Sequence, residues 1–105
     1  MCDTDVAPRL GRTRFVWDEA KAQSNLRKHG IGFEEAALVF DDPLATSVHD
    51  RIVDGEVRWY IIGMGKGCLL LLVVHTFREI ADTEVIRIIS ARRAEPYERR
   101  LYGNG

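Results

Sequence analysis

Residues Cys68 to Phe77, CLLLLVVHTF, form a long apolar run that begins directly after a turn-forming segment, Gly65-Lys66-Gly67. A run that is apolar at successive positions is typical of a strand covered on both faces, so we expect this strand to be central in a sheet. Three further runs read as strands, at 44–50 (LATSVHD), 57–63 (VRWYIIG) and 84–91 (EVIRIISA).

The part of the chain before these strands predicts two helices. In the first, DEAKAQSNLRKHG, Asp18 is a candidate N-cap and Gly30 fits the left-handed position past the end. Residues 33–40, FEEAALVF, carry apolar side chains at helical spacing, and Asp42-Pro43 ends that second helix. The second pattern indicates a helix that packs on the core.

A final helix is expected from Glu95-Pro96 onward, because proline is tolerated in the first turn of a helix. Residues 1–13 are polar and lack an apolar period, so they read as a flexible N-terminal extension before one domain at 14–105. The predicted fold is α+β, with two N-terminal helices, a four-stranded, mainly antiparallel sheet and a C-terminal helix.

The composition is that of one ordinary globular domain, with 105 residues, 46% hydrophobic and 30% charged. The two cysteines, Cys2 and Cys68, do not have metal-ligand spacing and suggest a reducing environment. The first residues lack the apolar core of a signal peptide, and no apolar run approaches the length of a membrane span. We therefore expect a cytoplasmic protein that does not contact membranes.

The formal net charge of −1 conceals an uneven distribution of charge. Residues 57–105 hold eight Lys or Arg against five Asp or Glu, and their arginines gather late in the chain, at Arg87, Arg92, Arg93, Arg99 and Arg100. This cluster is either a phosphate-binding surface or a solvated helix face. On the first helix, Lys21, Asn25 and Lys28 share one side, which is either solvated or meets something anionic.

No catalytic triad or zinc-binding signature occurs in the sequence. Cations and a few proton-transfer groups remain, a set that suits phosphodiester cleavage, because negative charge gathers on the nonbridging oxygens in the transition state. RNA supplies its own nucleophile, the 2′-hydroxyl. The protein then has to accept that proton, hold the phosphorane and protonate the departing 5′-oxygen.

Strand alternation divides the candidate residues. His75 and Arg78 point to opposite faces of their strand, and Arg87 and Arg92 do the same on the next one. Two subsets therefore fit one face each, His75 with Arg87 and Arg78 with Arg92. A shift of one residue in the register would separate the first pair.

Four segments together resemble the BrnT toxin family of bacterial type II toxin–antitoxin modules: WDEAKAQSNLRKHG, FEEAALVFDDP, LLVVHTFRE and IRIISARRAEPYERRLY. The resemblance runs from about residue 15 to 102. It implies a RelE-like fold and a ribonuclease that inhibits translation. One departure is Gly32, where a serine capping the second helix would be expected.

The residues and the resemblance together predict a metal-independent endoribonuclease without a cofactor. The candidate catalytic residues are His75, Arg78, Arg92 and Lys28. The candidate RNA-binding residues are Lys21, Arg87, Arg93, Tyr97 and Tyr102. For His75 the alternative is a histidine whose hydrogen bonds are satisfied inside the sheet, and for Lys21 it is a solvated helix face.

The resemblance also implies partners. A ribbon-helix-helix, BrnA-like antitoxin would neutralise the toxin in a 2:2 or higher complex, and operator DNA would be contacted only through that antitoxin. We expect the antitoxin to cover part of the segment from Arg87 to Arg100. The alternative function is a noncatalytic module that binds nucleic acid or antitoxin and acts as a transcriptional corepressor.

Overall fold

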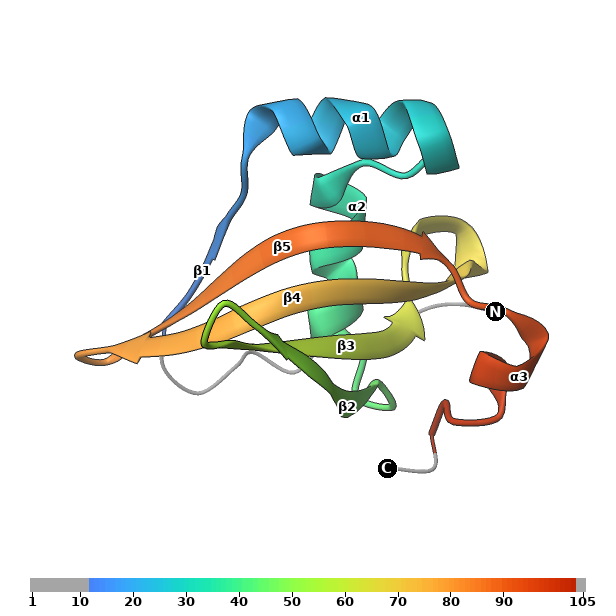
Figure 1. Ribbon diagram of the computed structural model, residues 1–105. Helices are drawn as coiled ribbons and strands as arrows, with labels where there is room; N and C mark the ends of the chain where they lie inside the picture. The colour runs from blue at the N-terminus through green and yellow to red at the C-terminus, as the bar shows by residue number, and fades with distance from the viewer. Residues whose placement is uncertain (1–11, 104–105) are drawn as a thin grey trace.

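A mixed five-stranded sheet with strand order β1-β5-β4-β3-β2 forms the centre of the computed structural model, which describes residues 12–103 (Figure 1). The strands are β1 (Arg12–Val16), β2 (Thr46–Val53), β3 (Glu56–Met64), β4 (Leu70–Ile80) and β5 (Thr83–Arg93). The helices are α1 (Glu19–His29), α2 (Phe33–Ala37) and α3 (Pro96–Arg99), with short 3-10 turns η1 (Leu38–Asp41) and η2 (Lys66–Cys68).

The apolar run in the sequence becomes β4, which pairs antiparallel with β3 on one side and with β5 on the other. Leu71 and Val73 of β4 are fully buried, as expected for a central strand. The α+β class and the four predicted strands, β2 to β5, are confirmed, and β2 lies at an edge of the sheet as a weak strand would.

The prediction of a four-stranded sheet is wrong, because β1 adds a fifth strand parallel to β5, from Arg12 opposite Thr83 to Val16 opposite Arg87. Its five residues are too few to show a clear alternation, and the partner lies about 70 residues further along the chain. Arg12 and Thr13 therefore belong to the sheet and not to an extension. The rest of the predicted extension, residues 1–11, lies outside the described residues.

The first helix has the predicted limits. The Asp18 side chain accepts a hydrogen bond from the backbone N–H of Lys21 at 3.1 Å, which caps the start of α1. Gly30, with φ of 72°, donates to the carbonyl of Leu26 at 2.8 Å and ends the helix in the left-handed conformation.

The other two helices are shorter than predicted. The second is α-helical only to Ala37 and tightens into η1 before Pro43, and Gly32 provides no side-chain cap. The last helix starts at Pro96 as predicted, and Glu95 and Glu98 form a capping box at its beginning. It ends at Arg99, so Leu101 lies in the turns that follow.

The sheet has two different faces. The helix face packs against α1, α2 and η1 around buried side chains that include Ile31, Phe33, Val39, Ile61, Leu71, Val73, Ile86 and Ile88. The opposite face, here called the open face, is covered at one end by the C-terminal segment 94–102, which packs on Ile62 and Leu72. In Figure 1, α2 crosses behind β5 and β4, α1 lies beyond the β5 edge of the sheet, and α3 follows the end of β5.

Among residues 12–103, no helix is long and apolar enough to cross a membrane.

Candidate functional site

Two β-bulges decide which side chains reach the open face. In β5, Ser90 lies opposite Val74 and Ile88 lies opposite His75, so Ile89 is an extra residue. In β2, Asp50 is extra in the same way, between His49 and Arg51. An extra residue shifts the alternation of the strand by one position, so side chains beyond it change face.

The sequence prediction that Arg87 and Arg92 point to opposite faces is therefore wrong. Arg87 lies opposite Thr76 and Arg92 lies opposite Leu72, and both of those β4 residues share the face of Arg78. Of the two predicted subsets, His75 with Arg87 is wrong, whereas Arg78 and Arg92 do share one face as predicted but lie far apart along it. His75 lies on the helix face, away from Arg87, and Arg78 is six residues of β4, about 20 Å, from the level of Arg92.

Arginines from all five strands reach the open face outside the part covered by the C-terminal segment. Arg51 pairs with Arg58, and Arg14 and Arg78 both lie beside Val85. Sequence reasoning missed Arg14, Arg51 and Arg58, because β1 was not recognised and the bulge at Asp50 is invisible in the sequence. The available signal was that Glu56, Arg58 and Tyr60 occupy alternate positions of β3, which places their side chains on one face.

An ion pair between Arg87 of β5 and Glu56 of β3 spans the open face. The pair spans β4, which lies between the two strands; Arg87 lies opposite Thr76 of β4, and the Thr76 side chain is buried. Near it on β3, the Nε atom of Arg58 is buried and has no hydrogen-bond partner among the described residues. Arg58 therefore has a donor that a phosphate oxygen could satisfy after a small movement of the side chain.

His75 is 5% exposed and packs under η1, where its ring meets Phe40 edge to face at 4.7 Å. Its Nδ1 donates to the carbonyl of Val73 at 3.2 Å. Burial lowers the pKa of His75, and the hydrogen bond to Val73 offsets part of that effect. The geometry favours the alternative of a satisfied histidine inside the fold over a proton-transfer group.

Lys21 and Lys28 are exposed on α1, which contacts β5 and lies beside that edge of the sheet (Figure 1), so they stand outside the group of arginines on the open face. Asn25, expected on their side of the helix, is instead buried. Its Nδ2 donates to the carbonyls of Ile31 and Ala91, at 3.0 and 2.8 Å, and its Oδ1 accepts from the backbone N–H of Ala91 at 3.0 Å. β1 pairs with β5 only as far as Arg87. At Ala91 the Asn25 side-chain amide forms the backbone hydrogen bonds that a neighbouring strand would otherwise form.

Arg92 is engaged in the structure of the C-terminal segment. Its Nη1 and Nη2 donate to the two carboxylate oxygens of Glu98, at 2.8 and 2.7 Å. The hydrogen bonds from Arg92 lower the pKa of Glu98, and the same contacts raise the pKa of Arg92. Arg92 thus fastens α3 to β5 and is not a free charge stabiliser.

Tyr102 and Tyr97 differ in their surroundings. The Tyr102 hydroxyl donates to Oδ2 of Asp42 at 2.6 Å, and burial together with this carboxylate raises the pKa of Tyr102 to about 12. Tyr102 therefore ties the C-terminal segment to the loop before β2. Tyr97 is exposed, and so is Arg93, which lines an open hollow of about 330 Å³ with Arg99 above Met64, Leu69 and Leu70.

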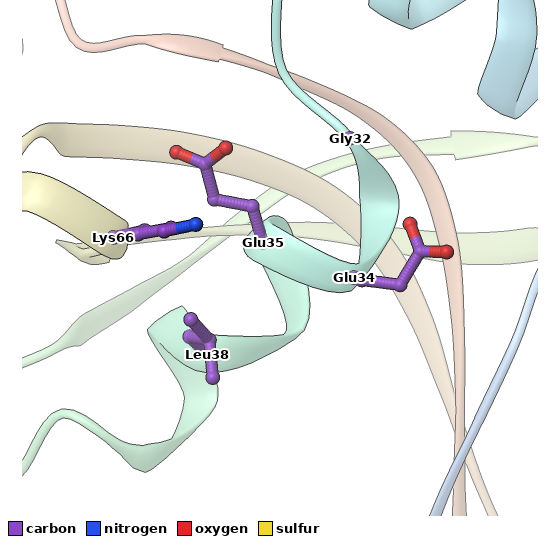
Figure 2. Close-up of a pocket in the computed structure, with 5 residues that line it drawn as sticks. All are labelled: Gly32, Glu34, Glu35, Leu38 and Lys66. Atoms are coloured by element: carbon purple, nitrogen blue, oxygen red, sulfur yellow. The ribbon is translucent and has the colours of Figure 1, made fainter.

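A second hollow, of about 440 Å³, lies over the start of α2 (Figure 2). Glu35 and Lys66 point toward one another across it, while Glu34 points away. Its lining of two carboxylates and one lysine does not suit a polyanion. Among residues 12–103, no three or more His, Cys, Asp or Glu side chains are grouped to hold a metal ion.

Comparison with known proteins agrees with the resemblance seen in the sequence. Residues 17–98 match the family model described as the ribonuclease toxin, BrnT, of type II toxin–antitoxin systems. The 1.1 Å crystal structure of the Brucella abortus ribonuclease toxin, BrnT, is 26% identical and has a TM-score of 0.57, covering 80% of this chain and 97% of that one. A comparison with curated protein sequences gave no significant match. The chain belongs to the BrnT family of ribonuclease toxins from type II toxin–antitoxin systems.

Proposed function

We propose that the chain is a metal-independent endoribonuclease that binds single-stranded RNA on the open face and inhibits translation by cleaving it. The observation that carries this proposal is the gathering of Arg14, Arg51, Arg58, Arg78 and Arg87 on one sheet face. Five guanidinium groups suit an RNA backbone, because each can donate two hydrogen bonds to a phosphate and carries a charge that does not titrate.

Arg58 and Arg87 hold the reacting phosphate in this proposal. They lie on either side of the buried Thr76, where the Arg87–Glu56 pair crosses the sheet. Arg78 and Arg14 follow along the same face and bind neighbouring phosphates. Exposed Tyr97 extends the contact at the other end, where a base can stack on the phenol ring. Arg93 lies opposite Leu71, a helix-face residue, and stands outside this contact.

Five other sequence candidates do not enter the proposed site. His75 is buried on the helix face, and Lys21 and Lys28 lie on α1. Arg92 is bound to Glu98, so its part is to hold the fold around the site. Tyr102 is likewise bound, to Asp42.

Incubating the purified chain with unstructured RNA in the presence of EDTA tests the proposal. We expect cleavage that chelation does not slow, with products ending in a 2′,3′-cyclic phosphate and a 5′-hydroxyl, since the 2′-hydroxyl is the nucleophile. RNA bound tightly but left intact would contradict the enzymatic proposal and would favour the noncatalytic corepressor.

The family membership implies an antitoxin, and we propose that a ribbon-helix-helix, BrnA-like protein covers Arg93, Tyr97 and Arg99 in a 2:2 or higher complex. These three side chains are exposed at the end of the sheet where the C-terminal segment lies. Operator DNA is then reached only through the antitoxin. Arg93→Glu with Arg99→Glu should abolish co-purification with the cognate antitoxin, whereas Lys21→Glu should leave it intact; the reverse result would move the interface to α1.

A further inference from the structure

We propose that Glu56 accepts the proton of the attacking 2′-hydroxyl, a role that rests on the proposed RNA cleavage. Among the described strand residues that the pairing register places on the open face, Glu56 alone carries a carboxylate. The groups around it are cationic: Arg58 on its own strand, and Arg51, Arg78 and Arg87 on β2, β4 and β5.

The position of Glu56 suits this role. Its side chain is 37% exposed, so substrate can reach the carboxylate. Among the described contacts of Glu56, the Arg87 guanidinium binds the Oε1 atom and leaves the other carboxylate oxygen unbound. This ion pair fixes the orientation of the carboxylate. The other oxygen can then face a hydroxyl group placed over Thr76 and Arg58.

The proposed step is balanced within the RNA, the carboxylate and solvent. The 2′-hydroxyl proton moves to the Glu56 carboxylate while the 2′-oxygen forms a bond to phosphorus. The bond from phosphorus to the 5′-oxygen breaks, and that oxygen takes a proton from water. A neutral Glu56 attracts Arg87 less strongly, so the guanidinium can turn its donors to the nonbridging oxygens as their charge develops.

Glu56→Gln tests the inference, because it keeps the size of the side chain and removes the proton acceptor. We expect the cleavage rate at saturating RNA to fall by about 100-fold or more, as is usual for loss of a general base. RNA affinity should stay the same or rise, since a negative charge is lost from a cationic face. Glu56→Asp should keep a larger part of the rate than Glu56→Gln does.

A merely structural Glu56, needed to position Arg87, would give a different result. Glu56→Gln and Arg87→Ala would then both weaken RNA binding. The fall in cleavage rate at acid pH, which protonation of a general base causes, would persist in the Glu56→Gln variant. Cleavage by Glu56→Gln within a few-fold of the parent chain would overturn the role of Glu56 and leave the proposed function standing. Absence of cleavage by the parent chain would overturn both.

Discussion

Arg92 at the end of β5 and Glu98 of α3 form a two-pronged ion pair, with nitrogen–oxygen distances of 2.8 and 2.7 Å, and the Glu98 side chain is 7% exposed. The backbone N–H of Glu95 also donates to Glu98, at 2.7 Å. This carboxylate therefore holds the C-terminal segment against one end of the open face, and the role of Arg92 is to stabilise that packing.

Arg92→Ala should lower the free energy of unfolding by about 1–3 kcal/mol, because it leaves the nearly buried Glu98 carboxylate with one hydrogen bond fewer on each oxygen. The value stays below that of a fully buried pair, since Arg92 itself is 35% exposed and partly screened by water. Urea denaturation measures the change, with the exposed Arg93→Ala as the control. Equal stability of the two variants would show that the pair does not hold the segment.

Acidification should remove the same stabilisation. The hydrogen bonds from Arg92 lower the pKa of Glu98 in the folded state, so its contribution is present above the ordinary glutamate value of 4.5 and is lost as the pH falls through the lower folded-state pKa. The slope of unfolding free energy against pH in this acid range should be smaller in Glu98→Gln than in the parent chain. An unchanged slope would argue against the lowered pKa.

Tyr102 should titrate separately from the other tyrosines. Burial and the Asp42 carboxylate raise its pKa to about 12, so the neutral phenol stabilises the fold fully below the ordinary value of 10 and loses this effect as the pH rises toward 12. Absorbance titration of the phenols should show one step near 12 that Tyr102→Phe removes. Survival of that step in the variant would assign it to another residue.

Asn25→Ala should destabilise the chain more than any substitution of the neighbouring lysines on α1. It removes three hydrogen bonds and leaves the N–H and C=O of Ala91 unpaired at a buried strand edge, which costs about 2–4 kcal/mol. Thermal or urea unfolding measures the loss, with Lys28→Ala as the matched control on the exposed side of the helix. A loss as small as that of the control would contradict this role for Asn25.

Local signals in the sequence were sufficient for much of the fold. Asp18 and Gly30 mark the ends of α1, and the apolar run from Cys68 predicts the central strand, because caps and continuous hydrophobicity act over a few neighbouring residues. The parallel pairing of β1 with β5 could not be predicted, since its register depends on contacts between residues far apart in the chain.

The candidate site was predicted less well, because the face of each side chain depends on single extra residues. The bulges at Asp50 and Ile89 change no local propensity, yet they place Arg51, Arg87 and Arg92 on one face. The burial of His75 could not be read from the sequence either. The sequence offers His75 as a titrating group, and the packing of Phe40 over its ring removes it from solvent.

RNA affinities of variants on the open face and on α1 show which surface of the protein binds RNA. A single-stranded RNA with 2′-O-methyl groups cannot be cleaved through the 2′-oxygen, so its equilibrium affinity can be measured as salt is varied. Arg58→Ala and Arg87→Ala should each weaken binding several-fold and reduce the slope of log K against log salt by about 0.7, the value for one lost phosphate contact on a single strand. Lys21→Ala and Lys28→Ala on α1 should leave affinity and slope unchanged. Loss of affinity in the α1 variants, with the open-face variants unaffected, would contradict the claim that RNA binds the open face of the sheet.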